Sequence, residues 1–470
     1  MNIDLSKNSC NLIENTYKYH IHVITNIFIF YYTSTDMERT LIKDLPNRIG
    51  FHILIKWFLH DLRKLGKIAF LIVRDCSGLT QCILDQTEQI ESLVWLQTGT
   101  ILSIEGQVVS ANNKFGLEIN QCHITILNPC IYPNPVDITK DIINVELDTL
   151  LENRAVTLRH LYWTTIFQVA SSLEKNIRNF FDSQGFTQIN TPKIIAFPTE
   201  WGAEVFGFQY FDKQAYMAQS PQFYKQMMVP VLERVYEIGR AYRAEKSSTS
   251  RHMTEILMLD MEMGFIDSFQ DVIQMTQKFF KTSIDNTRAE CQDKFAYLGQ
   301  TQPLLPGEFP RITVAKLHEL MYVQTWEDYR GELDLVPAEE RWICEYSASN
   351  RWSDAVFVTD FPRSDAKFYH HQSPENPEAT DRADLLFRWV EVATLTRRQV
   401  KYEILMSQIQ SKGINPDQPG LKYYLDAFKY GMPESGGFWF GMARCIQKLC
   451  WLANAKEAEL FPRDTNRLTP

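Results

Sequence analysis

The sequence predicts an α+β protein in which a small β-barrel precedes a larger domain of mixed strands and helices. Three observations support this prediction. Five short β-rich runs come first, a proline-rich segment follows them, and strand-like and helical runs then alternate to the end of the chain. The 470 residues are enough for two or three domains, and a hydrophobic content of 45% can fill more than one core.

The barrel prediction rests on residues 37–127, where β-rich runs are separated by glycines. Five strands within so short a stretch are typical of a small closed barrel. The five runs are GFHILIKWFLH, KIAFLIVRD, LTQCILD, TILSIEGQVVS and GLEINQCHITIL.

Prolines mark the end of the predicted barrel. Pro129, Pro133 and Pro135 stand close together in LNPCIYPNPVDI. Proline lacks an N–H donor and has a fixed φ angle, so such a segment favours an extended chain. We therefore expect residues 128–155 to be a linker between two domains.

The second domain is expected to span residues 156–470. It opens with apolar residues at helical spacing in residues 160–181, which predict a long amphipathic helix that stops before Gly185. Further strands are expected in RVYEIGRAYRAE, EILMLDMEMGFI, AVFVTDF and DLLFRWVEV, and further helices in SPQFYKQMMVPVLE, YEILMSQIQSKG and MARCIQKLCWLAN.

Composition excludes several classes of protein. Lys and Arg number 48 against 57 Asp and Glu, and a net charge of -9 argues against a protein that coats nucleic acid through bulk positive charge. The nine cysteines are scattered without a Cys-x-x-Cys pair, which disfavours disulfides and zinc and indicates the reducing cytosol. No apolar run reaches the roughly 18 residues of a membrane span, so no membrane association is expected.

Residues 1–36 differ in character from the rest of the chain, and we expect translation to begin at Met37.

Three charged segments interrupt otherwise apolar sequence. In the first, Arg243 and Glu245 are two residues apart in a predicted strand, which directs both side chains to one face, as a site for a phosphate and an amine requires. An exposed ladder of ion pairs is the alternative. The third segment, GGFWFGMAR, is a glycine-rich turn that leads into a helix carrying Arg444, and alone it is weak support for any function.

The second charged segment is DLLFRWVE, which places Asp384 and Glu391 in a predicted apolar strand. Buried carboxylates need a compensating cation, and Mg²⁺ that bridges nucleotide phosphates is a common solution. The alternative is that Asp384 lies at the mouth of the strand and Glu391 pairs with Arg397 or Arg398.

Together the charged segments resemble the signature motifs of class II aminoacyl-tRNA synthetases. Motif 1 corresponds to residues 185–192, motif 2 to 243–255 and motif 3 to 441–444, and the resemblance covers nearly all of the chain from Met37. The run QSPQFYKQ and the ending that starts with FPRD resemble the aspartyl-tRNA synthetases of the archaeal and eukaryotic type. This resemblance implies an OB-fold anticodon-binding barrel followed by a class II catalytic domain, built on an antiparallel sheet with flanking helices.

The resemblance also implies an activity. It is the ATP-dependent ligation of L-aspartate to tRNA(Asp) through an aspartyl-adenylate, carried out with Mg²⁺ by a cytoplasmic homodimer. Arg243 would bridge the α-phosphate and the substrate carboxylate, and Arg444 would stack on adenine; both are the expected catalytic residues. The implied ATP-binding residues are Arg243, Glu245, Arg251, His252, Glu391 and Arg444, and the implied Mg²⁺ ligands are Asp384 and Glu391.

For the amino acid, the resemblance implies two cations that read one side-chain carboxylate, Lys225 and Arg398. Asparaginyl enzymes typically have an apolar residue in place of Lys225, because a lysine facing a neutral amide lacks a charge partner. Aspartate is therefore favoured over asparagine. The residues expected around the ammonium and backbone end are Glu200, Ser220, Gln222 and Asp260.

The barrel would read the anticodon. Phe70, Gln81 and Glu118 match the positions that stack on or hydrogen-bond an anticodon base, and OB-folds read single strands by aromatic stacking with polar edge contacts. Phe70 as a residue of the barrel core is the alternative. The sequence leaves open whether tRNA(Asn) is also charged, and two other readings remain: an asparaginyl-tRNA synthetase or a non-catalytic tRNA-binding paralogue.

Tryptophan occurs where the family pattern has or accepts glycine. The positions concerned are Trp57, Trp201, Trp389, Trp439 and Trp451, with Trp352 as a sixth candidate. Replacing glycine by the largest side chain overpacks a binding site. Because some bacteria read the codon UGA as glycine, we hypothesise that these positions are glycine in the native protein. A paralogue that has lost its activity is the rival explanation.

Overall fold

The computed structural model describes residues 37–198, 204–247 and 249–470. The chain divides into two compact units, the first ending at Asn134 and the second beginning at Pro135. Three of the sequence predictions fall outside the described residues: the extension of residues 1–36, Glu200 and Trp201.

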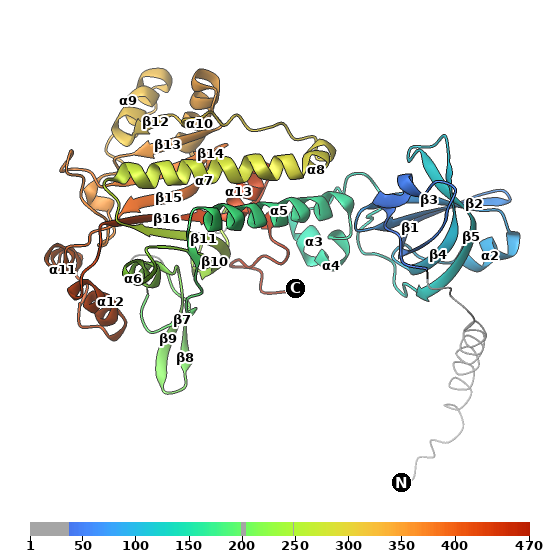
Figure 1. The fold of residues 1–470 in the computed structure, drawn as a ribbon, viewed down its shortest axis with the longest axis horizontal. Helices are drawn as coiled ribbons and strands as arrows, with labels where there is room; N and C mark the ends of the chain where they lie inside the picture. The colour runs from blue at the N-terminus through green and yellow to red at the C-terminus, as the bar shows by residue number, and fades with distance from the viewer. Residues whose placement is uncertain (1–36, 199–203, 248) are drawn as a thin grey trace, which may run out of the picture. The chain divides into compact units, whose positions relative to one another are not determined.

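The first unit is a closed five-stranded barrel with the strand order β1-β2-β3-β5-β4 (Figure 1). Side chains alternate between the core and the outer face along each strand. Leu71 and Val73 of the second strand are buried in the core, whereas Phe70 is only half-buried and lies outside it. The elements are η1 (Ile42–Arg48), β1 (His52–Leu65), β2 (Ile68–Asp75), β3 (Gly78–Leu84), α2 (Thr87–Leu93), β4 (Ile101–Ser110) and β5 (Leu117–Asn128).

The second unit is built on an eight-stranded sheet with the order β12-β13-β14-β15-β16-β11-β10-β6. The six central strands pair antiparallel with one another. The two edge strands pair in parallel, so the sheet is mixed only at its edges. The strands are β6 (Thr187–Gln188), β10 (Arg234–Tyr242), β11 (Glu255–Gly264), β12 (Arg311–Thr313), β13 (Ala355–Thr359), β14 (Arg382–Phe387), β15 (Val390–Arg397) and β16 (Ser435–Gly441).

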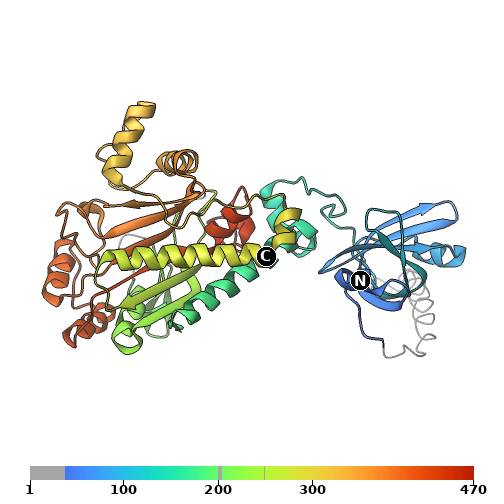
Figure 2. The ribbon, with the colours of Figure 1, turned by 45° about the horizontal axis from the view of Figure 1, so that its top comes forward.

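Two long helices, α5 (Leu161–Ser183) and α7 (Phe269–Glu290), lie side by side on one face of this sheet (Figures 1 and 2). The first of them is the amphipathic helix that the sequence predicts. The second begins at Ser268, whose side chain and that of Asp271 form a capping box that satisfies N–H groups at the helix start.

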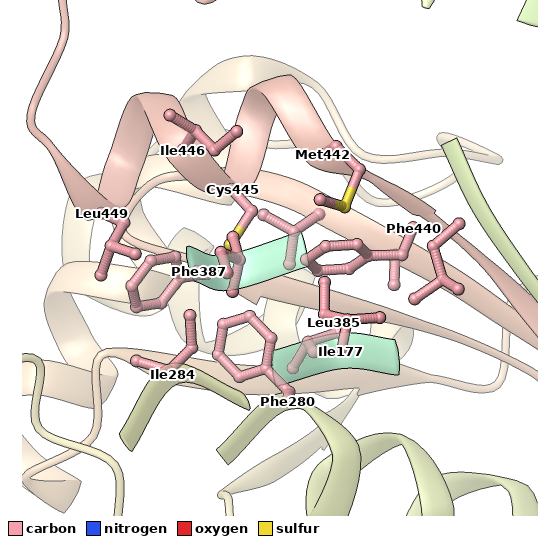
Figure 3. Close-up of a cluster of buried hydrophobic side chains, with 14 of the residues drawn as sticks. Ile177, Phe280, Ile284, Leu385, Phe387, Phe440, Met442, Cys445, Ile446 and Leu449 are labelled. Atoms are coloured by element: carbon pink, nitrogen blue, oxygen red, sulfur yellow. The ribbon is translucent and has the colours of Figure 1, made fainter. Parts of the chain in front are cut away.

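The core lies between these helices and the sheet (Figure 3). Ile177 of α5 and Phe280 of α7 meet Leu385, Phe387 and Phe440 from the central strands, and all five side chains are buried. Burial of large apolar side chains is the main favourable term in folding, so this packing fixes the central strands in place.

The remaining elements surround the sheet. The segment predicted as linker contains two short helices at its C-terminal end, α3 and α4. None of the described helices is both long and apolar enough to cross a bilayer. The other elements are α3 (Leu147–Glu152), α4 (Arg154–Thr157), α6 (Gln222–Leu232), α8 (Gln292–Tyr297), α9 (Val314–Thr325), α10 (Pro337–Arg351), η2 (Arg363–Asp365), α11 (Tyr402–Ser411), α12 (Pro419–Lys429), α13 (Met442–Leu449), η3 (Ala455–Ala458), and a three-stranded sheet of β7 (Ile194–Ile195), β9 (Lys213–Met217) and β8 (Gly207–Tyr210).

The run DLLFRWVEV, predicted as one strand, is a hairpin. β14 ends at Phe387 and β15 begins at Val390, and these two residues pair directly. The two-residue turn between them has φ angles of 44° at Arg388 and 80° at Trp389. Two consecutive positive φ angles are typical of the type I′ turn, whose usual signal is glycine or asparagine. The signal is absent from this sequence, which explains the wrong prediction.

Candidate active site

The candidate site lies on the face of the central strands that α5 and α7 leave uncovered. Along β16, Phe438 and Phe440 point into the core against Phe279 of α7. Because side chains alternate along a strand, residue 439 points to the opposite face. Trp439 lines two neighbouring cavities there.

The two cavities differ in size and share part of their walls. The larger cavity has a volume of about 290 Å³, and the smaller has about 90 Å³. Arg243 and Trp439 line both of them. Of the other predicted site residues, Gln222, Glu391 and Arg398 line the larger cavity, and Glu245, Arg251, His252 and Arg444 line the smaller one.

Arg243 stands between the cavities, just beyond the end of β10. Because β10 ends at Tyr242, the prediction that Arg243 and Glu245 lie in a strand is wrong, but their side chains are 4.0 Å apart and both line the smaller cavity. The Arg243 backbone N–H donates to Thr254 O at 2.9 Å. This hydrogen bond joins the two ends of the loop that connects β10 to β11. Its Nε is buried and finds no hydrogen-bond partner among the described residues. A buried, unsatisfied guanidinium N–H is costly, so this atom is suited to an anionic ligand.

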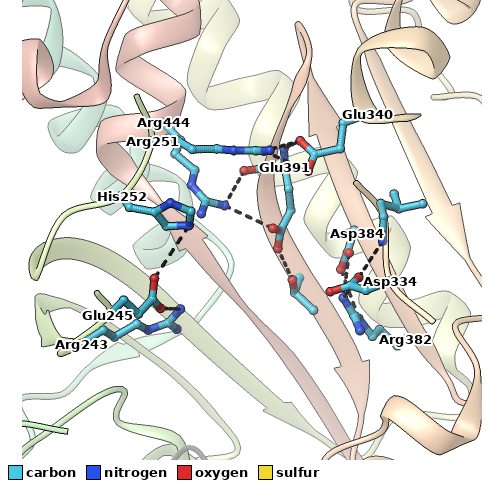
Figure 4. A network of polar contacts seen from close by, with 12 residues as sticks. Arg243, Glu245, Arg251, His252, Asp334, Glu340, Arg382, Asp384, Glu391 and Arg444 are labelled. Atoms are coloured by element: carbon cyan, nitrogen blue, oxygen red, sulfur yellow. Dashed lines mark hydrogen bonds and ion pairs between the residues drawn. The ribbon is translucent and has the colours of Figure 1, made fainter. Parts of the chain in front are cut away.

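The smaller cavity carries a cluster of charged groups (Figure 4). Glu245 Oε2 lies 3.7 Å from His252 Nε2. Arg251 donates to both carboxylate oxygens of Glu340 on α10, at 2.6 and 2.9 Å. Burial lowers the pKa of His252, Glu245 opposes the shift, and three neighbouring arginines add to it. These surroundings favour the neutral form of His252.

Arg444 comes from the first turn of α13 and reaches across to β15. Its Nη1 donates to the Glu391 carboxylate at 3.2 Å and to the Glu391 carbonyl at 3.1 Å. Burial on its own would raise the pKa of Glu391, but Arg444 and the Thr394 hydroxyl together hold it below its ordinary value. Glu391 thus pairs with Arg444, and the alternative pairing with Arg397 or Arg398 is wrong.

Asp384 lies on β14, next to the strand that carries Glu391. Its carboxylate accepts from Arg382 Nη2 at 3.0 Å. Burial raises the pKa of Asp384 to about 7; Arg382 opposes this shift, and Glu391 and Asp334 reinforce it. The part of the chain that the structure describes holds no cluster of three potential metal ligands. Two close carboxylates that repel one another nevertheless fit a Mg²⁺ ion that takes its other ligands from phosphates and water.

Two ion pairs lie at and behind the wall of the larger cavity, where only Arg398 is part of the lining. Arg398 holds the buried Glu262 carboxylate in a bidentate arrangement, with distances of 2.7 and 2.8 Å. Lys225 on α6 donates to Asp260 at 3.0 Å and to the Phe438 carbonyl at 3.0 Å. Burial raises the pKa of Asp260, although Lys225 opposes the shift.

The structure therefore separates the two predicted side-chain readers. Arg398 lines the larger cavity, whereas Lys225 is buried behind its wall, 3.6 Å from Glu262. Ser220 is buried as well, and its hydroxyl accepts from the N–H of Gln222 at the start of α6.

In the barrel, the three predicted anticodon residues lie together on the outer face. Gln81 is directly opposite Ile72 in the β2–β3 pair. Phe70 is two residues from Ile72 on the same strand, so Gln81 lies diagonally beside Phe70. Gln81 Nε2 donates to Glu118 of β5 at 3.3 Å. The alternative that Phe70 belongs to the barrel core is wrong, because it is half-buried and lies outside the core cluster. Arg63, exposed and directly opposite Phe70, adds a positive charge to this face.

Sequence reasoning missed three charged residues that organise the site. Glu262 stands two residues after Asp260 in EILMLDMEMG, and this spacing on a strand was a usable signal for a shared face. Arg382 precedes Asp384 by two residues and gave the same signal. Glu340 lies on a helix about 90 residues from its partner Arg251, and no local pattern indicates that contact.

Comparison with known proteins decides the family. Residues 146–465 match the family described as tRNA synthetases class II (D, K and N). The chain belongs to the class II tRNA synthetases. Residues 54–127 match the OB-fold nucleic acid binding domain, which confirms the predicted nature of the barrel. This class II synthetase is thus an enzyme with both domains that the sequence predicts.

Individual relatives carry narrower names. The chain is 39% identical to a protein named Aspartate--tRNA(Asp/Asn) ligase from Thermus thermophilus, over 92% of this chain and all of that one. It is 36% identical to one named Aspartate--tRNA(Asp) ligase from Thermococcus kodakarensis, over 90% of this chain and 97% of that one. The crystal structure of asparaginyl-tRNA synthetase from Pyrococcus horikoshii with asparaginyl-adenylate matches with a TM-score of 0.85. It covers 92% of this chain and 100% of that chain at 24% identity, and this likeness concerns the fold alone.

Proposed function

We propose that this synthetase ligates L-aspartate to tRNA(Asp) through an aspartyl-adenylate, with ATP as the energy source. The observation that carries the proposal is Arg398 in the lining of the larger cavity, with Lys225 buried behind that wall. Two cations in one small region suit a ligand with a negatively charged side chain. The relatives named as aspartate ligases, which are 36 and 39% identical, support the same substrate.

Activation requires two anions to meet, because the substrate carboxylate attacks the α-phosphate of ATP and pyrophosphate leaves. Arg243 is placed for this task, since it lines both cavities and its buried Nε has no partner within the described chain. A guanidinium aimed at the point where negative charge develops stabilises the transition state without reorganisation. Arg243 is therefore the proposed catalytic residue that bridges the two reactants.

The smaller cavity is the proposed position of the nucleotide. Arg444 provides a planar guanidinium for the adenine ring, and Arg251 and His252 face the phosphate tail, with Glu245 beside them. Asp384 and Glu391 would hold Mg²⁺ when it is bound, and the ion would neutralise phosphate charge. Glu340 keeps Arg251 in position through its two hydrogen bonds.

At the amino-acid end, Arg398 is the proposed residue that contacts the aspartate side chain. Two hydrogen bonds to Glu262 already orient the Arg398 guanidinium, so the Arg398 side chain loses little rotamer entropy when substrate binds. Lys225 contributes its charge from behind the wall, where Asp260 fixes its position. Gln222 lines the same cavity, and Ser220 accepts a hydrogen bond from its N–H, which supports the proposal that Gln222 contacts the backbone end of the substrate and that Ser220 positions it. Glu200, predicted for the ammonium group, lies outside the described residues.

Exchange of labelled pyrophosphate into ATP tests this step. Aspartate is expected to support exchange, and asparagine at the same concentration is expected to support little, because a neutral amide leaves Arg398 without a second anionic partner. An asparaginyl enzyme would show the reverse preference. Exchange with neither amino acid would favour a non-catalytic paralogue.

The barrel is the proposed anticodon reader. Phe70 offers a stacking surface, Gln81 and Glu118 offer polar edges, and the exposed Arg63 suits the RNA backbone. The relative named for tRNA(Asp/Asn) makes tRNA(Asn) a second candidate substrate. Charging of the two purified tRNAs, compared at equal concentration, distinguishes an enzyme for one tRNA from an enzyme for both.

We also propose that the enzyme works as a cytoplasmic homodimer. The segment of motif 1 forms β6, the last strand at one edge of the eight-stranded sheet, where a second copy has access to it. The mass measured by light scattering is expected to be twice the 54.9 kDa of one chain. A fully active enzyme with the mass of one chain would contradict the dimer.

A further inference from the structure

Four tryptophans have backbone conformations that belong to glycine. The φ angles are 65° at Trp326, 54° at Trp352, 80° at Trp389 and 55° at Trp451. Residues with a Cβ seldom adopt this left-handed region, and bulky ones least of all, whereas glycine enters it without steric cost. Ten described residues other than glycine have a positive φ, and tryptophan, a rare residue, accounts for four of them.

Three of these tryptophans end helices in the manner of glycine. After α13, the N–H of Leu452 donates to Gln447 O at 2.8 Å while Trp451 adopts the left-handed conformation. This six-to-one bond is the Schellman motif, whose left-handed position is usually glycine. Trp326 and Trp352 occupy the left-handed position at the ends of α9 and α10. Their side chains are 80% and 74% exposed, so no burial compensates for the unfavourable backbone.

Trp389 occupies the second position of the two-residue turn between β14 and β15. A type I′ turn requires positive φ at both central residues, and glycine is the usual residue at the second. The turn holds the two strands that carry Asp384 and Glu391. Its conformation therefore matters to the proposed ATP site.

Trp439 has an ordinary strand conformation, but it interrupts a row of glycines that faces the site. Gly437, residue 439 and Gly441 lie on the same face of β16. At Gly437 a Cβ would lie 2.1 Å from Met261 O, so the backbone there has no room for a side chain. Arg243 and Arg444 lie 5.6 and 5.8 Å from the centre of the Trp439 ring. The indole thus stands between the two arginines that must meet one nucleotide.

The Trp439 ring divides the candidate site into two cavities. Trp439 lines both cavities, and the smaller one has only about 90 Å³. Binding cavities for ligands of nucleotide size are usually about 300–1,000 Å³. Glycine at 439 would remove the indole from the wall that the two cavities share, which leaves Arg243 as the residue that lines both.

We infer that positions 326, 352, 389, 439 and 451 are glycine in the functional protein, and that glycine at 439 joins the amino-acid and nucleotide cavities. The part that concerns position 439 rests on the proposed function. The structure also revises the set named from sequence. Trp57 is removed, because it lies in extended β1 opposite Leu102, with Arg39 stacked 4.9 Å from its ring. Trp326 is added, and Trp352 is retained, because both have positive φ angles. Trp201 lies outside the described residues, and glycine at that position stays a prediction.

The experiment compares single glycine variants of the full chain. Trp352→Gly is expected to raise the thermal midpoint, because it places glycine in a left-handed position. Trp342→Gly is the matched control, since Trp342 lies inside the same helix and stacks on Tyr346. This control is expected to lower the midpoint. A fall in the midpoint for Trp352→Gly as large as for Trp342→Gly would overturn the inference for the helix ends.

Binding of ATP tests position 439 separately. Trp439→Gly is expected to bind ATP roughly tenfold more tightly or better, while Trp352→Gly binds as the parent chain does. Unchanged affinity in Trp439→Gly would overturn the inference for this position. Tighter ATP binding without aspartate-dependent exchange would uphold it and contradict the proposed function instead.

The gene provides an independent readout. The same codon, UGA, is expected at all five positions, and a different codon is expected at Trp57, Trp163 and Trp342. UGG at the five positions would overturn the recoding and support a decayed paralogue.

Discussion

Charged side chains at and behind the wall of the larger cavity are paired with one another. Glu262 is fully buried and is held by Arg398, while Lys225 and Asp260 pair beside it. Buried charges are tolerated only when they are matched, so each of these groups depends on the others. The arrangement fixes the orientation of the Arg398 guanidinium, which supports its proposed role in selecting an acidic substrate.

Arg398→Lys tests this role of the guanidinium fork. Lysine keeps the charge but loses the bidentate hydrogen bonds, so the KM for aspartate in pyrophosphate exchange is expected to rise roughly tenfold or more, with little change in the KM for ATP. Arg397→Lys is the matched control. Arg397 is next to Arg398 in the sequence, but it pairs with Glu434 and lines neither cavity. Equal effects of the two substitutions on the KM for aspartate would argue against contact between Arg398 and the substrate.

His370 makes stability depend on pH. Its ring is buried beside the larger cavity, and burial, with Arg398 and Arg382 nearby, holds its pKa well below the ordinary value of 6.5. The unfolded chain binds a proton below about pH 6.5 and the folded chain does not, so the free energy of unfolding falls as the pH falls below 6.5. His370→Gln is expected to flatten this part of the curve, as measured by urea unfolding at several pH values.

The neighbouring His371 supplies the control for that measurement. It pairs with Asp381 at 2.9 Å and is partly exposed. His371→Gln is expected to leave the acid slope produced by His370 in place. An unchanged slope in His370→Gln would show that other groups cause the loss of stability in acid.

At the scale of elements, the sequence predicted most of the regular structure because hydrophobic spacing was clear. The helix predicted at residues 160–181 is α5, and the five barrel strands are where the alternating runs place them. The hairpin at Arg388 and Trp389 was missed, because the residues of its turn carry no turn signal. The short helices α3 and α4 were missed because each has too few residues to show a period.

The site was predictable only in part, for a physical reason. Motif residues such as Arg243 and Arg444 are close to recognisable local patterns, and the structure brings both to the same cavity. Whether a side chain faces a cavity or lies behind its wall depends on packing between distant strands. Lys225 is the example, since it points to Asp260 and the Phe438 carbonyl, away from the cavity surface.

The outer face of the barrel permits a test with adjacent residues of β2. Phe70→Ala is expected to weaken tRNA binding by about 1–3 kcal/mol, because one stacking surface is lost. It should leave aspartate-dependent pyrophosphate exchange unchanged, since that reaction belongs to the other unit. Leu71→Ala, one residue along and in the core, is expected to lower the free energy of unfolding by about 2–5 kcal/mol.

Filter binding with labelled tRNA and thermal unfolding distinguish the two variants. If Phe70→Ala loses as much stability as Leu71→Ala does, Phe70 packs in the barrel core and not on the outer face. Unchanged tRNA affinity in Phe70→Ala would remove it from the proposed anticodon site.

At the scale of the whole molecule, two units divide the task that the proposal assigns to the chain. The barrel offers a face with an aromatic ring and a nearby arginine, and the second unit offers arginines around two cavities. A net charge of -9 disfavours binding of tRNA by the charge of the whole protein, so the proposal assigns tRNA binding to local surfaces. In the proposed function, both units take part in the complete reaction, and activation of aspartate uses only the second.

The most direct test is aminoacylation by the full chain with glycine at positions 326, 352, 389, 439 and 451. With ATP, Mg²⁺ and labelled aspartate, we expect purified tRNA(Asp) to accumulate aspartate on its terminal ribose. Binding of tRNA(Asp) without charging, or charging with asparagine in place of aspartate, would contradict the account.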